Sequence, residues 1–462
     1  MIATVTFNGK NYRLINTDHV DPLKNAFTII VGKNGTGKSR LLGQIALDFI
    51  QKFTSFEAAN LVESNLSGEG YTTVSLNSNK LIAVSTSPFD KFPVSKYINQ
   101  KKFEILQYSY LGIRELMQRN LGFAYLSKIM ASLIKTISNR PDQRHEIKRI
   151  LNYLGYEDSM EMVFESRISR STLEQIIDSI AASKDPSNLT RILNLNTLSF
   201  GSYFHYNDDD MSLTSKLNTI VKVLKRIRKQ PPQNLKEFRL RIDGEGIHTS
   251  INYPKFIDDF LFLIRCGTMR LKEVRLTKQL AETSVLISEA SSGEQAIVLS
   301  ILGIASQIED GAVICIDEPE ICLHPEWQER YIKLLTSTFA TYSSCHFIIA
   351  THSPQIVSNL EPENSYILSL ESGATTDARE FVRHSADFQL ANVFNFPGFK
   401  NEYLSRIALN IFAKVSKNKA FDEEDRSSFE LLIDQSAFLS ADDPVFQLYN
   451  ALKQMFQAYG RN

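Results

Sequence analysis

The chain has 462 residues, with 51 Lys and Arg against 52 Asp and Glu, so its formal net charge is −1. This balance argues against a protein that binds polyanions through its overall charge, although a local basic patch stays open. Hydrophobic residues make up 43% and charged residues 22% of the chain, as in ordinary globular proteins. No apolar run reaches the roughly 18 residues that indicate a transmembrane helix.

The cysteines and the N-terminal stretch bear on the cellular location. The first 15 residues predict two short strands rather than a signal peptide. Cys315 and Cys345 lie in or beside apolar strand patterns, and none of the four cysteines belongs to a C-x-x-C pair. We therefore expect reduced, buried thiols in a cytoplasmic protein, and no zinc site.

The elements in chain order predict an α/β domain that is interrupted once. Its first part covers residues 1–95, with buried strands at 27–31 and 80–86 and a helix between them. Residues 96–270 change character, and we expect a mainly helical insertion there. Its amphipathic segments have helical spacing and lie at roughly 119–138, 142–154, 171–184 and 213–229.

The α/β pattern returns in the second part of the domain, residues 271–385. The alternating helices and strands are expected at 293–308, 312–317, 325–339, 346–351 and 366–370. Residues 386–462 predict an α-helical C-terminal extension of three polar helices. The acidic run at 422–425 suits the N-terminal end of one of them. We find no internal repeat and no heptad run long enough for a coiled-coil arm.

A phosphate-binding loop follows the first buried strand. Residues 32–39, GKNGTGKS, match G-x-x-x-x-G-K-[ST] in full, between a predicted strand and helix as this loop requires. Its backbone N–H groups would face the phosphates, Lys38 would reach the β and γ phosphates, and Ser39 would ligate Mg²⁺. The candidate nucleotide-binding residues of this loop are Gly32, Asn34, Gly35, Thr36, Gly37, Lys38 and Ser39.

Two carboxylates end the strand predicted at 312–317. Asp317 could hold the Mg²⁺, directly or through water, and Glu318 could orient and deprotonate the attacking water. An acidic strand end that only faces solvent is the simpler interpretation. The phosphate loop before this pair and the strand after it favour the functional interpretation.

His352 ends the strand predicted at 346–351, at the sheet edge where open α/β folds bind ligands. It could contact the γ phosphate and sense its loss, although a lone histidine is more often structural. For His324, in the LHP string, a role in fixing the loop is about as plausible as a functional one.

The stretch SSGEQ, residues 291–295, precedes an apolar helix. Ser292 offers a hydroxyl and Gly293 an unshielded N–H group at a helix N-terminus, which is an anion-binding arrangement. A plain helix cap explains the same residues equally well, since Ser is favoured there. The candidate nucleotide contacts of this stretch are Ser291, Ser292, Gly293 and Glu294.

The four motifs together resemble the heads of ABC-type ATPases. GKNGTGKS is similar to the Walker A motif, SSGEQ to the signature and ICIDEP to Walker B, while His352 matches the switch histidine. This resemblance implies a phosphate-loop sheet flanked by helices, with ATP and Mg²⁺ as cofactors. It also implies a homodimer, or a larger assembly, in which the signature of one copy completes the nucleotide site of the other. The functional interpretation of Ser292 is then favoured over the helix cap.

Two positions depart from the family's pattern. The glutamine loop should follow the strand at 80–86, where the sequence has SPFDKF instead. Ser87 and Asp90 are candidates for that role. Tyr12 is a candidate for the aromatic residue that stacks on adenine.

The string DEPEICLHPEWQ narrows the resemblance to the non-transporter branch of SMC-like repair ATPases, overcoming-lysogenization-defect nucleases and anti-phage ATPases. After residue 370 we find no D-x-D pattern for a nuclease metal site, so we expect that the chain is not itself a nuclease. The layout of head, insertion and tail resembles the ATPase subunit of Septu-type anti-phage systems. That resemblance implies an HNH-type nuclease as partner, with DNA contacted through the complex.

Two alternatives stay open at this point. One is a DNA-repair ATPase of the recombination-mediator type that acts directly on DNA, and the other is a nucleotide sensor that does not hydrolyse ATP. The basic stretch at 221–230 bears on the first, because five of its ten residues are Lys or Arg. A solvated helix face is the favoured interpretation of these charges.

Overall fold

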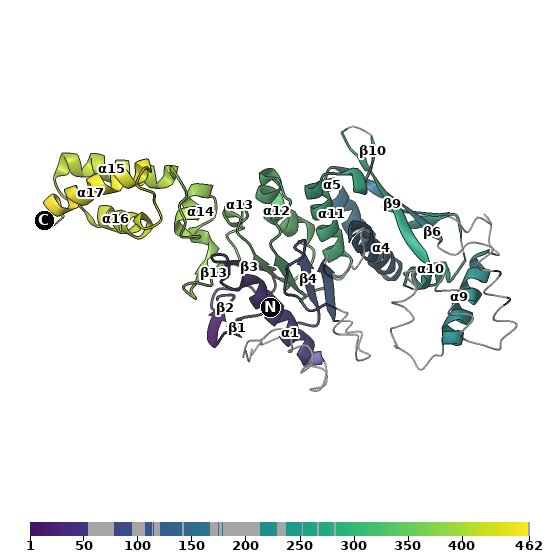
Figure 1. The fold of residues 1–462 in the computed structure, drawn as a ribbon. Coiled ribbons are helices and arrows are strands. Elements are labelled where there is room, and N and C mark those ends of the chain that lie inside the picture. Colours follow the sequence, from purple (N-terminus) through teal and green to yellow (C-terminus); the bar gives the residue numbers. More distant parts are fainter. Residues whose placement is uncertain are drawn as a thin grey trace.

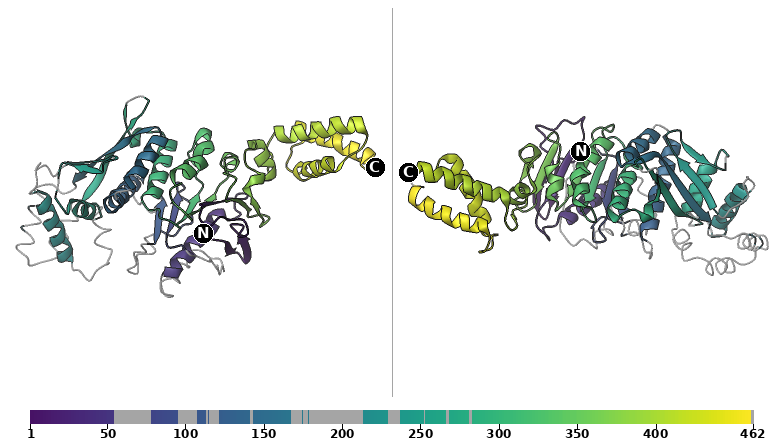
Figure 2. Two further views of the ribbon diagram at one scale, coloured as in Figure 1. Left: turned by 180° about the vertical axis from the view of Figure 1, so that it is seen from behind. Right: turned by 90° about the horizontal axis from the view of Figure 1, so that it is seen from above.

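The computed structural model describes residues 1–53, 78–94, 107–112, 114, 121–140, 143–166, 174, 178, 213–228, 237–251, 253–265, 268–280 and 283–460. An α/β body lies in the middle of the molecule (Figure 1). An antiparallel sheet with α9 (Leu213–Arg228) lies at one end and the C-terminal helices at the other. Both views of Figure 2 show the same elongated order.

A seven-stranded sheet forms the centre of the body, in the order β14-β13-β3-β12-β11-β4-β5. Neighbouring strands are parallel except β13 and β14. The carboxyl ends of the six parallel strands therefore share one edge, where open α/β sheets bind ligands. The strands are β3 (Ala26–Val31), β4 (Leu81–Ser85), β5 (Tyr108–Gly112), β11 (Val313–Asp317), β12 (His346–Ala350), β13 (Ser365–Ser369) and β14 (Thr375–Asp377).

Helices cover both faces of this sheet. Along β12, Phe347 and Ile349 join the core on the side of α11 (Ser292–Ala305), α12 (Pro325–Thr338) and α13 (Pro354–Ser358). Ile348 and Ala350 join the core on the side of α1 (Lys38–Phe53) and the hairpin of β1 (Thr4–Phe7) and β2 (Lys10–Arg13). Because both faces are buried, these strands are continuous apolar runs, as the sequence indicated. The α/β expectation and the two N-terminal strands are confirmed.

The described part of the insertion contains helices, as expected, and also most of a five-stranded antiparallel sheet that the sequence did not lead us to expect. The strand order is β10-β9-β6-β7-β8. Three helices accompany this sheet, namely α4 (Leu121–Asn139), α5 (Gln143–Tyr153) and α10 (Phe256–Arg265). The strands are β6 (Tyr156–Ser166), β7 (Glu237–Ile242), β8 (Ile247–Thr249), β9 (Met269–Lys278) and β10 (Ser284–Leu286).

The sequence signal for these strands was the alternation of apolar and polar residues with a period of two. In β7, EFRLRI, the three apolar residues are buried while Arg239 and Arg241 are exposed. This is the pattern of a sheet with one solvated face. In β6 the pairing register shifts on both sides of the run Met160–Val163, which interrupts the alternation and hid the strand. The expected helices at 119–138, 142–154 and 213–229 are confirmed as α4, α5 and α9. The segment at 171–184 lies almost entirely outside the described residues.

The insertion also shares its core with the body, so the expected boundary at residue 95 is too early. Strand β5 ends at Gly112 and pairs in parallel with β4 of the main sheet. Side chains of α4, β6, α11 and α12 belong to one hydrophobic cluster. The antiparallel sheet is therefore a lateral continuation of the nucleotide-binding body, and its strand β10 precedes the start of α11 in the chain.

The C-terminal extension is helical, as expected. It consists of α14 (Ala386–Asn392), α15 (Glu402–Asn418), α16 (Glu423–Ser436) and α17 (Pro444–Tyr459). The last three helices enclose a core of their own that includes Leu404, Phe429 and Leu452. Asp422 caps α16 by accepting from the N–H of Asp425 at 2.8 Å, which confirms the acidic run as a helix start. Across the described ranges, every helix is too short or too polar to cross a bilayer.

Candidate nucleotide site

The phosphate loop joins β3 to α1 at the ligand-binding edge of the sheet. Gly37 has φ +102°, and a Cβ there would lie 3.2 Å from a ring carbon of Phe7, so the position requires glycine on two grounds. Thr36 Oγ1 donates to the carbonyl oxygen of Lys33 at 2.9 Å and closes the turn. The first N–H groups of α1 have no partner within the helix. The strand, loop and helix context expected for residues 32–39 is thus present.

Lys38 lies across this loop and is only 5% exposed. Its Nζ donates to the carbonyl oxygens of Gly32 at 2.8 Å and of Lys33 at 3.3 Å. Burial lowers the pKa of Lys38, and four nearby carboxylates oppose that shift. A buried ammonium beside the free N–H groups of a helix start suits the phosphates of a nucleotide. The four carboxylates belong to Asp317, Glu318, Glu320 and Glu371.

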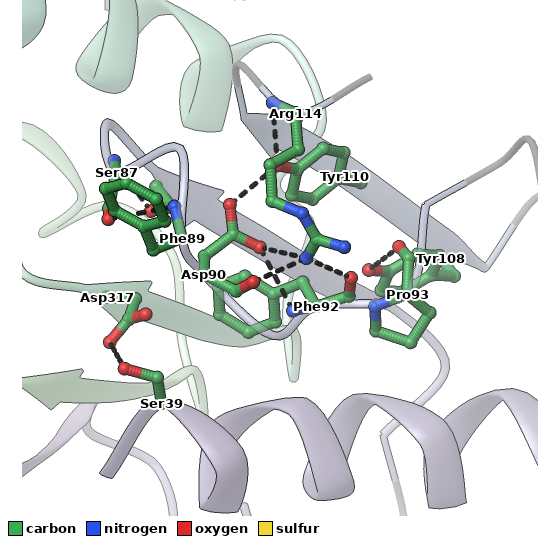
Figure 3. A network of polar contacts seen from close by, with 11 residues as sticks. Ser39, Ser87, Phe89, Asp90, Phe92, Pro93, Tyr108, Tyr110, Arg114 and Asp317 are labelled. Atoms are coloured by element: carbon green, nitrogen blue, oxygen red, sulfur yellow. Dashed lines mark hydrogen bonds and ion pairs between the residues drawn. The ribbon is translucent and has the colours of Figure 1, made fainter. Parts of the chain in front are cut away.

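Ser39 and Asp317 meet at the carboxyl ends of the strands (Figure 3). Ser39 Oγ donates to Asp317 Oδ1 at 3.1 Å. The pKa of Asp317 is raised to about 7, mainly by burial and further by the charges of Glu318, Asp90 and Glu320, while the hydrogen bond from Ser39 opposes this shift. A hydroxyl and a carboxylate are hard oxygen donors of the kind that Mg²⁺ prefers. A buried carboxylate crowded by others gains most from a cation, so these residues fit a magnesium ion.

Glu318 begins the turn after β11 with φ +48°, a left-handed conformation that is uncommon for a residue other than glycine. Its N–H donates to the carbonyl oxygen of Ala350 at 2.9 Å, which fixes it beside the end of β12. Such strain persists where the surroundings impose it, often at functional sites. The position suits the expected role of Glu318.

His352 follows β12 at the same edge. Burial and the charge of Lys38 lower the pKa of His352 to about 4. The imidazole is therefore neutral at physiological pH and acts through a hydrogen bond rather than through charge. The Lys38 charge acts on His352 and on Glu318, so the structure brings the expected catalytic residues to the phosphate loop.

The start of α11 divides the SSGEQ stretch into two pairs. Ser291 Oγ accepts from the N–H of Glu294 at 3.3 Å, and Glu294 Oε2 accepts from the N–H of Ser291 at 3.1 Å. This is a capping box, so the helix-cap interpretation is correct for Ser291 and Glu294. Ser292 is exposed. A Cβ on the buried Gly293 would lie 2.9 Å from the carbonyl oxygen of Cys322. Ser292 and Gly293 take no part in the capping box.

Two glutamates at the site were not singled out from the sequence. Glu371 accepts from the N–H of Lys33 at 2.8 Å and so holds the phosphate loop. Glu320 accepts from Thr351 Oγ1 at 2.8 Å and from the N–H of His352 at 2.5 Å. Each lies just after the carboxyl end of a strand of the main sheet. This position in the sequence could have identified both glutamates as site residues.

The candidates for the glutamine-loop role are committed to other contacts. Asp90 accepts from the N–H of Phe92 at 3.0 Å, from Tyr110 Oη at 2.8 Å and from Arg114 Nη1 at 3.0 Å (Figure 3). Ser87 Oγ accepts from the N–H of Phe89 at 3.2 Å. The segment thus folds as a tight structural turn. The glutamine-loop role of Ser87 or Asp90 stays a prediction.

Two further candidates have structural positions. Tyr12 is 6% exposed and packs in the core beside α1, so its ring does not offer a face to adenine. His324 is the N-cap of α12, where its side chain accepts from the N–H of Glu326. This supports the loop-fixing interpretation of His324.

The basic stretch on α9 has a buried apolar side, with Val221, Leu224 and Ile227 in the core. Arg226 Nη2 forms an ion pair with Asp259 Oδ1 at 2.8 Å. One positive charge of the basic stretch is therefore neutralised within the chain. The favoured interpretation of a solvated face agrees with this arrangement.

Comparison with known proteins assigns the fold to a family. The model of the AAA ATPase domain matches residues 6–357. The chain belongs to this family. Two curated relatives are "Retron Ec83 probable ATPase" of Escherichia coli and "Retron Vc95 probable ATPase" of Vibrio cholerae serotype O1 biovar El Tor. The first is 23% identical over 89% of this chain and 83% of its own length. The second is 20% identical over 74% of this chain and 68% of its own length.

Among solved structures, the Smc head domain of Pyrococcus furiosus bound to the C-terminal domain of ScpA is similar at 13% identity. The likeness covers 82% of this chain and 97% of that one, with a TM-score of 0.31. At this TM-score the likeness supports no conclusion about the chain beyond those drawn from its own sheet topology and motifs. The family match and the complete phosphate loop make the chain an ATPase of the phosphate-loop class.

Proposed function

We propose that this ATPase binds ATP with Mg²⁺ and closes as a head-to-head dimer around two composite sites. The observation that carries the proposal is the start of α11. There Ser291 and Glu294 form reciprocal hydrogen bonds with each other, while Ser292 stays exposed on the first turn of the helix. A free hydroxyl and a glycine N–H at a helix start suit the γ phosphate held by a second copy.

Each residue of one site has its own role in ATP hydrolysis. Lys38 and the N-terminus of α1 hold the phosphates, and Ser39 and Asp317 hold the metal ion, whose charge offsets that of the phosphates. Glu318 orients the attacking water and accepts its proton. The neutral imidazole of His352 hydrogen-bonds to the γ phosphate and registers its loss.

We further propose that the nucleotide state controls a partner HNH-type nuclease in anti-phage defence. Retron ATPases that match 89% and 74% of this chain support a role in defence. The extension has a hydrophobic core of its own. It therefore folds as a unit whose outer surface is available to a partner. Lys33 of the phosphate loop also places its Nζ 4.7 Å from the ring centroid of Phe438 in the extension. The large apolar side chains exposed on the extension are Phe396, Phe399, Leu409, Phe412, Ile433 and Phe438.

Co-purification with the product of the neighbouring gene tests this proposal. Leu409 and Phe412 lie three residues apart on α15 and are exposed, so Leu409→Asp with Phe412→Asp should release the partner. Leu23→Asp is the matched control, because Leu23 is 77% exposed on the body and should leave the complex intact. Absence of an HNH-nuclease gene, or of a stable complex, would count against the partner.

Stimulation by DNA separates this function from direct action on DNA. The proposed ATPase should hydrolyse ATP at the same rate with and without DNA when its partner is absent. A large stimulation of the isolated chain would instead favour the DNA-repair function. A chain that binds ATP without any turnover would favour a nucleotide sensor.

A further inference from the structure

Glu320 ties together the two loops that carry Glu318 and His352. Its carboxylate lies two residues after Glu318 in the turn that follows β11. One oxygen accepts from the N–H of His352 at 2.5 Å and the other from Thr351 Oγ1 at 2.8 Å. Both oxygens of Glu320 are therefore directed at the end of β12 rather than at the phosphate loop.

A second tie joins the same two loops. Ser353 Oγ donates to Gln328 Oε1 at 2.8 Å, and Gln328 Nε2 donates to the carbonyl oxygen of Leu323 at 2.9 Å. The N–H of Ser353 donates to Thr351 Oγ1 at 3.0 Å, so the two ties meet at Thr351. Glu320 and Gln328 belong to the string DEPEICLHPEWQ, and both reach the THS turn that carries His352.

We propose that Glu320 is a positioning residue for ATP hydrolysis, which holds the backbone of His352 against the turn of Glu318. The inference rests on the proposed contact of His352 with the γ phosphate, and it does not depend on the dimer. Thr351 is fully buried and Glu320 is partly buried, so the Thr351 end of this link is shielded from water. A neutral imidazole acts through a hydrogen bond, whose strength depends on its placement.

The charge of Glu320 is used differently from that of Glu318. Both oxygens of Glu320 already accept hydrogen bonds from the chain, which leaves it poorly placed to take a proton from water. A glutamine can restore both contacts, because its carbonyl oxygen accepts from the N–H of His352 and its amide donates to the Thr351 hydroxyl oxygen. Alanine restores neither. The pair of substitutions therefore separates positioning from charge.

Steady-state hydrolysis by the full chain tests the proposal. Glu320→Ala should lower kcat by about 10- to 100-fold and leave KM for ATP within about twofold, because the phosphate loop is untouched. Glu320→Gln should retain kcat within about threefold. Thr351→Val removes one donor without changing side-chain size and should lower kcat at unchanged KM. Glu326→Gln is the control, because Glu326 is exposed in the same string and pairs only with Arg330 among the ion pairs of the described residues.

The double variant connects the effect to His352. If Glu320 acts through His352, Glu320→Ala should lower kcat no further when His352→Ala is already present. Normal kcat in both Glu320→Ala and Thr351→Val, beside a slow His352→Ala, would overturn the inference alone. A normal kcat in His352→Ala would instead refute the proposed role of the histidine. Equal loss in Glu320→Gln and Glu320→Ala would show that Glu320 acts by charge and would also overturn the inference.

Discussion

Ser39 Oγ donates to Asp317 Oδ1 at 3.1 Å, although 278 positions separate the two residues in the sequence. The contact joins the first turn of α1 to the carboxyl end of β11. It follows from the strand order, because only β12 separates β3, which leads into α1, from β11. The parallel sheet thus places a hydroxyl and a carboxylate together at the candidate metal site.

Asp317→Asn should increase the thermal stability of the chain and decrease its ATPase activity. Asp317 is 1% exposed and is crowded by other carboxylates that raise its pKa, so a neutral side chain should raise the melting temperature without metal. Hydrolysis should fall by about a thousandfold or more, because the metal loses its carboxylate. Thermal melts in EDTA and ATPase assays with Mg²⁺ check both effects. A less stable variant or one with normal turnover would contradict the assignment.

Ser292→Arg should leave nucleotide binding intact and abolish ATP-dependent dimer formation. Ser292 is exposed and takes no part in the capping box of α11, so the large side chain disturbs only a facing surface. Ser288→Arg is the matched control, since Ser288 is exposed shortly before the helix. Nucleotide binding by fluorescence and assembly by light scattering separate the two properties. A Ser292→Arg chain that still dimerises would reduce SSGEQ to a helix cap.

The sequence predicted the parallel sheet and its motifs because strands buried on both faces leave continuous apolar runs, as in β3 and β11. The antiparallel sheet was missed for two physical reasons. The register shifts in β6 break its alternation, and β7 alternates correctly but is only six residues long. Glu320 and Asp90 show a second limit. Their partners, Thr351 and Arg114, lie 31 and 24 positions away, and spacing alone does not reveal such contacts.

Arg114→Ala should destabilise the turn that replaces the glutamine loop. Arg114 Nη1 lies 3.0 Å from Asp90 Oδ1 and 3.1 Å from the carbonyl oxygen of Phe92. Asp90 is 1% exposed, so removal of the cation leaves a buried carboxylate. The free energy of unfolding should fall by about 3 kcal/mol. Urea denaturation measures this, and Lys91→Ala on the exposed part of the same turn should change it little.

The titration of His352 gives the stability a defined pH dependence. Its pKa in the folded chain is about 4, below the ordinary value of 6.5. The unfolded chain therefore binds more protons between these values, and stability should fall as the pH is lowered from about 6.5 to about 4. His352→Gln should lose part of this dependence. Urea midpoints at pH 5 and pH 7 check the sign, and an identical pH dependence in variant and wild type would contradict it.

The central claim, an ATP-closed dimer that hydrolyses its nucleotide, is tested most directly with Glu318→Gln. The substitution keeps the side chain's size and removes the base, so hydrolysis stops while ATP still binds. Sedimentation of this variant with ATP and Mg²⁺ should show a stable dimer, and without nucleotide a monomer. A variant that binds ATP yet stays monomeric, or that turns over like wild type, would contradict the account.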